Sequence, residues 1–106
     1  MTSNSKPDVR HIVIHKPGPK WAEGVDFRDQ EGVVEHVRHY QAMHEAGQLQ
    51  IGGPFLIPDS GGMMIPVRGL PEDEVRQIAA ADPAAKRGLL EFEIRPWYVT
   101  MKKATD

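Results

Sequence analysis

The chain has 106 residues with 13 basic and 15 acidic side chains, a formal net charge of −2. We therefore expect one domain without the basic footprint of a nucleic-acid-binding protein, and the absence of cysteine excludes disulfides and thiolate chemistry. No apolar run reaches the ~20 residues of a membrane span, and the polar start carries no apolar signal core, so we expect a cytoplasmic protein that does not bind membranes. The predicted layout is a disordered leader over residues 1–8 and a single domain over residues 9–102.

Residues 9–15 are rich in β-branched side chains and are followed by a turn at residues 16–19, which predicts a strand. Apolar side chains occupy both of its faces, a pattern typical of strands that are covered on both sides. They are Ile12 and Ile14 on one face and Val9 and Val13 on the other.

The loop at residues 20–30 contains two aromatic side chains, Trp21 and Phe27. It is longer than an ordinary connection, and we expect it to pack over the mouth of a pocket, with Trp21 excluding water or touching a ligand. Alternatively, the two aromatic side chains plug the end of the core.

A helix is predicted over residues 31–46, with Asp29 as its cap and Gly47 as its stop. His36 falls on the flank of the predicted buried stripe, and His39 points toward solvent. The stripe itself, at about 100° per residue, consists of Val33, Val37, Tyr40 and His44.

Three further strands and one further helix complete the predicted elements. The second strand contains Pro54, which removes a ladder donor, so we place it at a sheet edge. The second helix ends at Asp82, because the residue before a proline is disfavoured in helices. The predicted ranges are 49–55 and 63–68 for strands, 71–82 for the helix and 89–101 for the last strand. In the last strand Leu90, Phe92, Ile94 and Tyr98 face one way, and Glu91, Glu93, Arg95 and Trp97 face the other.

The order βαββαβ predicts an α+β fold of the ferredoxin-like type. In it, a four-stranded antiparallel sheet carries two helices on one face. The other face then lacks a cover, although the first strand is apolar on both sides. We expect a second copy of the chain to cover it, which predicts a homodimer whose sheets meet face to face.

The sequence resembles the YCII-related family of small dimeric α+β barrel proteins. The resemblance covers nearly the whole body of the chain, from about Arg10 to Met101. It is carried by His36, by the Asp59 turn, by residues 81–83 and 95–97, and by the stretch Glu45–Phe55, which is also similar to the Asp-Gly-Pro-Phe motif of a sister group. It implies a ferredoxin-like dimer with a His-Asp active site, in which the histidine falls on His36 and the aspartate on Asp82. Some relatives look like lyases that act on chlorinated hydroxylated aromatics. The insertion at residues 16–30 departs from shorter members of the family.

His36 and Asp82 are residue types suited to proton transfer, since a carboxylate can orient an imidazole and stabilise its charged form. The structural alternative is a boundary histidine and a helix-ending turn residue. His36, His39 and His44 have a spacing that could hold a metal, but no dense cluster of ligands follows, so we predict no metal site and no cofactor. His11 and His15 share the face of Val13 and could line a ligand pocket, but we favour strand-end and interface histidines there.

Six other residues are candidates for contacts with a small-molecule ligand. Gly53 allows close approach of the backbone to a ligand, and it precedes Pro54 and Phe55. Ser60 belongs to a tight turn near the pocket mouth and lacks the frame of a nucleophile elbow. Arg95 could hold an anionic substrate in a space shared by two sheets, or pair with neighbouring glutamates on an exposed face. The sixth candidate is Trp21.

Three functions therefore compete. The first is a cofactor-independent enzyme of the lyase or isomerase type that uses His36 and Asp82 on a small aromatic or carboxylated metabolite. The second is a small-molecule-binding or regulatory subunit without catalysis, and the third is a cofactor-free monooxygenase. The enzyme interpretation requires the side chains of His36 and Asp82 to meet within hydrogen-bond reach beside a pocket.

Overall fold

The computed structural model describes residues 7–103, so most of the expected leader lies outside the described residues, and Asp8 is already the first residue of a strand. The strands are β1 (Asp8–Pro17), β2 (Leu49–Pro54), β3 (Gly62–Pro66) and β4 (Leu90–Val99). The helices are α1 (Val33–Glu45), α2 (Glu72–Ala81), the short α3 (Pro83–Arg87), and a 3₁₀ turn, η1 (Phe27–Asp29). Element order thus matches the prediction, apart from η1 and α3.

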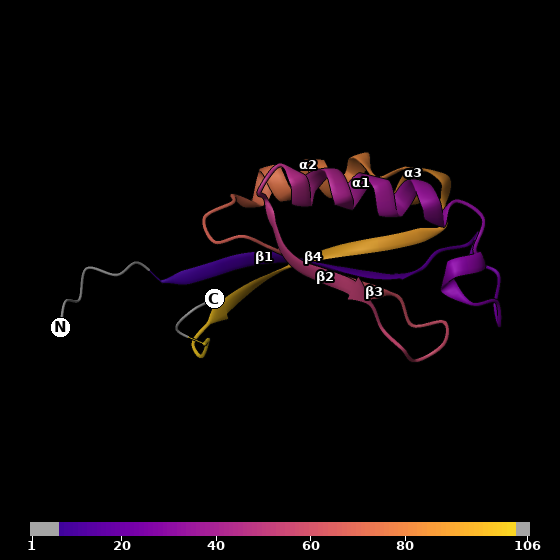
Figure 1. The fold of residues 1–106 in the computed structure, drawn as a ribbon, viewed down its shortest axis with the longest axis horizontal. Coiled ribbons are helices and arrows are strands. Elements are labelled where there is room, and N and C mark those ends of the chain that lie inside the picture. The colour runs from indigo at the N-terminus through magenta and orange to yellow at the C-terminus, as the bar shows by residue number, and fades with distance from the viewer. Residues whose placement is uncertain (1–6, 104–106) are drawn as a thin grey trace.

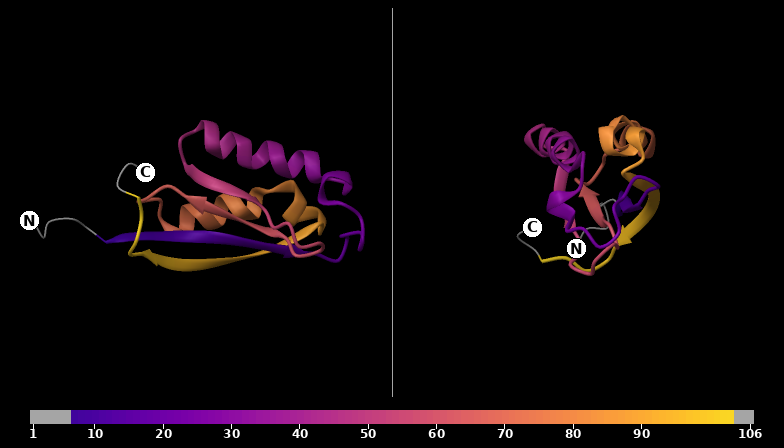
Figure 2. Two further views of the ribbon diagram at one scale, coloured as in Figure 1. Left: turned by 60° about the horizontal axis from the view of Figure 1, so that its bottom comes forward. Right: turned by 90° about the vertical axis from the view of Figure 1, so that its right-hand side faces the viewer.

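The four strands form one antiparallel sheet in the order β2-β3-β1-β4. The long strands β1 and β4 pair along their full lengths, and β2, which ends at Pro54, lies at an edge as predicted. All three α-helices lie over the same face of this sheet (Figures 1 and 2). The predicted ferredoxin-like α+β fold is therefore confirmed.

The core lies between the sheet and the helices. Val13 of β1 is 1% exposed and packs with Val75 and Ala79 of α2. Its neighbours across the sheet, Met64 and Ile94, pack against the same cluster. A second cluster fixes α3 against β4; it consists of Ala84, Leu89 and Leu90.

The predicted phase of the first helix is wrong. Val37 is 52% exposed and His44 is also exposed, whereas the buried residues of α1 are His36, Tyr40 and Met43. His39, expected in solvent, is half-buried, and its Nε2 lies 2.6 Å from the carbonyl oxygen of Ile78. The helix turns its polar His36 inward because that side chain has a partner across the fold, described below.

The second helix ends at Asp82 as predicted, but a further short helix that was not predicted follows it directly. Asp82 does end α2, but Pro83 starts α3, since a proline fits the first helical position. The Asp82 Oδ1 accepts a hydrogen bond from the backbone N–H of Ala84 at 2.9 Å, which caps α3. The chain direction changes at a residue that is itself completely buried.

None of the helices in the described part of the chain lies over the opposite face of the sheet (Figure 2). By strand alternation it carries an apolar band across three strands, and the outer side of β4 adds charged side chains. The apolar members are Ile12, Ile14, Ile51, Met63 and Ile65, and the charged ones are Glu91, Glu93 and Arg95. Within residues 7–103 no helix combines the length and apolar character needed to cross a membrane.

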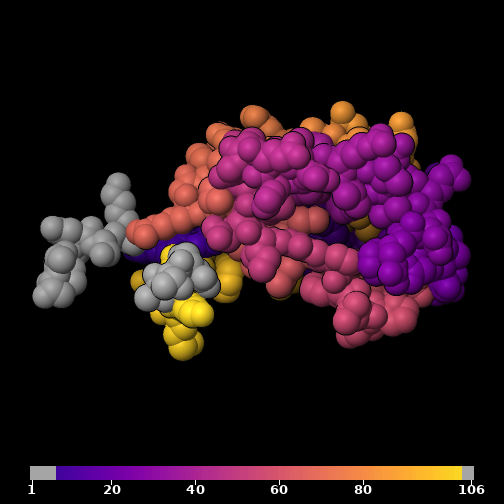
Figure 3. All heavy atoms as spheres, in the orientation of Figure 1, coloured from indigo at the N-terminus to yellow at the C-terminus, as the bar shows by residue number. Residues whose placement is uncertain are grey.

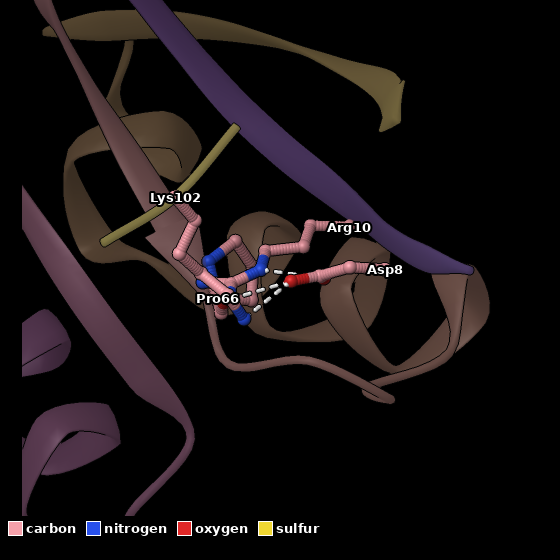
Figure 4. Close-up of polar contacts among 4 residues, drawn as sticks. All are labelled: Asp8, Arg10, Pro66 and Lys102. Carbon is pink, nitrogen blue, oxygen red and sulfur yellow. Dashed lines mark hydrogen bonds and ion pairs between the residues drawn. The ribbon is translucent and has the colours of Figure 1, made fainter. Parts of the chain in front are cut away.

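A salt-bridge cluster connects the N-terminal end of β1 with Pro66, the last residue of β3 (Figure 4). The Arg10 guanidinium donates two hydrogen bonds to the Asp8 carboxylate, at 2.9 and 3.1 Å, and a third to the Pro66 carbonyl at 3.3 Å. Lys102 Nζ lies 2.9 Å from the same carboxylate. The two cations hold the pKa of Asp8 well below its ordinary value, chiefly through the hydrogen bond from Arg10.

Candidate functional site

Two helices bring His36 and Asp82 together although 46 positions separate them in the chain. His36 lies in the second turn of α1, and Asp82 lies at the junction of α2 and α3, which pack beside α1 (Figure 1). The kink at Pro83 points the Asp82 side chain to one end of α3 instead of along a helix face.

The His36 Nδ1 lies 2.6 Å from Asp82 Oδ2, which is a short hydrogen bond between buried groups. A carboxylate only accepts, so the imidazole donates through Nδ1. The other carboxylate oxygen accepts the N–H of Ala84 at the N-terminus of α3, where negative charge is stabilised. Asp82 is thereby fixed at both oxygens, and no described residue is hydrogen-bonded to the His36 Nε2.

His15 of β1 and Tyr40 of α1 complete the buried cluster. His15 Nε2 lies 3.9 Å from Asp82 Oδ2 and 3.4 Å from the Tyr40 hydroxyl. The rings of His15 and His36 meet edge to face with centroids 5.0 Å apart. Burial, assisted by the nearby His36, lowers the pKa of His15 to about 4, so this imidazole is neutral at pH 7. Burial also raises the pKa of Tyr40 well above its ordinary value.

A cavity of about 550 Å³ opens beside this cluster, between α1 and the β2–β3 side of the sheet. His15, His36 and Tyr40 form part of its wall, and most of the remaining wall is apolar. The exposed side of α1, including Val37 and His44, faces this cavity. In the space-filling view a hollow is visible below α1, next to the loop that follows β1 (Figure 3).

That loop carries Trp21 and Phe27, and both side chains line the cavity. The Trp21 Nε1 donates to Asp59 Oδ1 at 2.7 Å, and the Gly24 N–H donates to the same carboxylate. Asp59 lies at the tip of the β2–β3 hairpin with φ +58°, which is uncommon for a residue with a side chain. The carboxylate therefore ties the loop to the hairpin at the end of the cavity.

The structure distributes the other predicted ligand contacts over three places. Gly53 and Pro54 line the cavity beside His36 and Asp82, the pair called the dyad below. Phe55 and Ser60 line a smaller cavity of about 320 Å³ on the outer side of the loop, where the Ser60 hydroxyl donates to the Ile57 carbonyl. Arg95 lies on the helix-free face of the sheet, 63% exposed, and pairs with Glu93 at 2.8 Å.

His15, His36 and Asp82 are also the one group of three that could hold a metal among the described residues, because one ligand atom of each lies within 4.8 Å of the others. Zinc ligands lie ~2.0–2.2 Å from the ion in a tetrahedral arrangement, which separates them by more than a hydrogen-bond distance. At 2.6 Å, the His36–Asp82 contact is the length of a shared proton. The distance between these two atoms therefore suits a hydrogen bond better than two ligands of one metal ion.

Sequence reasoning did not single out Asp59 as a site residue, and for His15 it preferred a strand-end or interface role over a place at a ligand pocket. His15 was expected at a strand end or interface, yet it shares the inward face of Val13, and that alternation was the available signal. Nothing in the sequence near Asp59 points to Trp21, because 38 positions separate the two residues and only the folded chain joins them.

Fold and site together define a ferredoxin-like α+β domain with a buried His-Asp dyad that opens onto a mostly apolar cavity. The chain belongs to the YCII-related domain family, whose model matches residues 9–98. Searches of the curated proteins and of the solved structures find no match.

Proposed function

We propose that this chain is a cofactor-independent enzyme that carries out proton transfer, of the isomerase or lyase type, on a small metabolite in the cytoplasm. The observation that carries the proposal is the buried 2.6 Å hydrogen bond between His36 Nδ1 and Asp82 Oδ2 at the wall of a cavity. A carboxylate that fixes the tautomer of an imidazole is a common way to prepare a general base.

In this mechanism Asp82 keeps the proton of His36 on Nδ1, so the lone pair of Nε2 is the base. Nε2 removes a proton from a substrate carbon or oxygen, and the resulting imidazolium is stabilised by the Asp82 charge. Return of the same proton to a different substrate atom completes an isomerisation. Delivery of that proton to a departing group completes an elimination. His36 ends each cycle in its starting state.

The wall of the cavity supports a small, largely apolar or aromatic substrate. Trp21, Phe27 and Val37 offer apolar surface, and His36 and its neighbours provide polar groups on the same wall. The volume of about 550 Å³ lies within the range of cavities that enclose small molecules. Such walls exclude water and strengthen the electrostatic interaction between Asp82 and a charged His36.

Hydrogen–deuterium exchange tests the proposal directly, because it detects proton removal from a substrate whatever product is formed. Small aromatic and carboxylated ketones are incubated with the protein in D₂O, and loss of carbon-bound protons is followed by NMR. We expect exchange in at least one compound with the wild type and its loss in His36→Asn, which retains an N–H donor toward Asp82 but lacks Nε2. Equal exchange by wild type and His36→Asn would contradict the proposal.

We also propose that the active form is a homodimer whose helix-free sheet faces meet. The apolar band on this face includes Ile51, which is 63% exposed, and the half-buried Ile12, Ile14 and Ile65. Burying such a band against a second copy removes apolar surface from water, and the charged side chains of β4 provide a polar rim.

Light scattering tests the dimer. We expect a mass near twice 11.9 kDa for the wild type. Ile14→Asp places a charge in the band and should yield monomers, while Val34→Asp, on the exposed outer side of α1, is the matched control. A wild-type monomer would contradict the dimer and would leave the dyad untouched.

A further inference from the structure

We propose that His15 is a second ligand-contacting residue, whose Nδ1 accepts a hydrogen bond from a hydroxyl or N–H group of the compound bound in the cavity. The inference rests on the proposed function, because it takes the cavity beside the dyad as the substrate site. It assigns a role to a residue that the dyad mechanism does not use.

The position of His15 in the sheet lets its ring, which is only 2% exposed, border the cavity. Its neighbour on β3 is Gly62, which has no side chain to cover the ring. The adjoining Gly61 has φ +86°, and a Cβ there would overlap with the His15 carbonyl group. The hairpin backbone therefore lies directly against His15, and both glycines line the same cavity as its ring.

The environment of His15 sets which of its nitrogens is the acceptor. A neutral imidazole has one N–H donor and one lone pair. Nε2 faces two oxygens, Asp82 Oδ2 at 3.9 Å and the Tyr40 hydroxyl at 3.4 Å. The negative carboxylate attracts an N–H and repels a lone pair, so the proton lies on Nε2 and the lone pair on Nδ1.

The His15 Nδ1 remains available to a ligand. No described residue donates a hydrogen bond to it. It is nevertheless not fully enclosed, because within residues 7–103 the one fully enclosed side-chain polar atom that lacks a partner is His11 Nδ1. The His15 Nδ1 is thus unpaired without being sealed off, on a ring that borders the cavity. An acceptor in such a place gains most from a ligand that carries a donor.

The two histidines then have different tasks. His36, paired with Asp82, exchanges a proton, whereas the neutral His15 holds a donor group of the ligand. Because the ring centroids are 5.0 Å apart, one small molecule can touch both rings. Compounds with a hydroxyl or N–H group next to the reacting atom are the ligand class that satisfies both residues.

Phenol and anisole form a matched pair of probes, since they share an aromatic ring and differ in the ability to donate a hydrogen bond. We expect wild-type protein to bind phenol about tenfold more tightly than anisole, the value of one buried hydrogen bond. His15→Asn keeps a polar group near the position of Nδ1 and should retain this ratio. His15→Gln keeps one near Nε2 instead, and the ratio should fall to about one.

The opposite pattern, with the ratio kept in His15→Gln and lost in His15→Asn, would show that His15 acts only through Tyr40 and Asp82 and would overturn the proposal. Equal affinities of the wild type for both probes, or no binding of either, would overturn it too. If a variant fails to fold, ¹⁵N NMR of the wild type decides, because the His15 Nδ1 signal must move with phenol and not with anisole.

The dyad can fail independently of His15. A phenol preference that disappears in His36→Asn but persists in both His15 variants would transfer the donor contact to the dyad and overturn the His15 proposal alone. A preference that follows His15 while no compound exchanges protons in D₂O would support the His15 contact and contradict the enzyme.

Discussion

Two buried carboxylates, Asp82 and Asp8, occupy opposite ends of the sheet, and both are paired with a basic side chain. Asp8 is held by Arg10 and Lys102, with three hydrogen bonds to its carboxylate (Figure 4). Asp82 is held by His36 and by the backbone of Ala84. The arrangement of charge is similar, but the partner of Asp8 is a guanidinium that keeps its proton at every working pH.

The difference lies in whether the base can exchange its proton and whether a ligand can reach it. Arg10 is 7% exposed, donates to Asp8 and Pro66, and lines neither cavity. His36 lies at the wall of the larger cavity, and no residue among 7–103 is hydrogen-bonded to its Nε2. A buried ion pair by itself therefore does not indicate catalysis, whereas a base that can exchange its proton next to a cavity does.

The largest expected effect comes from removing the exchangeable base. His36→Asn should lower the rate of proton exchange on a responsive substrate by about 10²–10⁴-fold, the usual contribution of general acid–base catalysis. Arg10→Lys, the matched change at the other carboxylate, should leave that rate unchanged and lower the melting temperature, because it loses the two-pronged contact with Asp8. A rate that falls in Arg10→Lys instead would break the comparison.

Acid should weaken the two ends of the molecule in different pH windows. The pKa of His15 is about 4 in the folded chain and 6.5 ordinarily, so the unfolded chain binds more protons between these values. The free energy of unfolding should therefore fall as the pH drops from 6.5 to 4, by at most about 1.4 kcal/mol per pH unit from this residue. Because the pKa of Asp8 is lowered in the folded chain, this residue decreases the free energy of unfolding only as the pH falls below about 4, where the carboxyl group of the unfolded chain becomes protonated.

Urea titrations at several pH values measure both windows. His15→Gln should flatten the upper window relative to wild type and keep the lower one, and Asp8→Asn should do the reverse. A wild-type free energy of unfolding that stays constant from pH 6.5 to pH 4 would contradict the buried, neutral state of His15.

The two oxygens of Asp82 can be separated by substitution. Asp82→Asn keeps an acceptor for the Ala84 N–H but loses the charge that faces His36, so it should fold and lose exchange activity. Asp82→Ala also loses the cap of α3, which should cost about 1 kcal/mol more in the free energy of unfolding. Equal stability of the two variants in urea would mean that the cap contributes nothing.

The smallest expected effect lies one residue from the dyad, at Val37. Because this side chain is 52% exposed and faces the cavity, Val37→Ala should change the free energy of unfolding by less than about 0.5 kcal/mol. Val75, with no exposed surface, is the control, and Val75→Ala should cost about 2 kcal/mol. A larger loss at Val37 than at Val75 would contradict the observed phase of α1.

The sequence predicted the order and type of most elements, because turn residues, β-branched runs and Pro-Gly signals act locally. It also paired His36 with Asp82, through the resemblance to the family. It placed Val37 inside, and it preferred an interface role for His15 over a place at a pocket, because both outcomes depend on long-range contacts. The cavity beside α1 makes an apolar residue face open space, and Asp82, 67 positions from His15, defines the polar centre of the core. Hydrophobic periodicity cannot distinguish a cavity wall from a packed core.

The state of His36 is the most direct test of the central claim, since it needs no substrate. Long-range ¹H–¹⁵N NMR of the imidazole nitrogens, assigned with His36→Asn, reports which nitrogen carries the proton. We expect His36 to carry it on Nδ1 at neutral pH, with an unprotonated Nε2, and to lose this preference in Asp82→Asn. A wild-type His36 with its neutral proton on Nε2, or a tautomer that is indifferent to Asp82→Asn, would contradict the dyad.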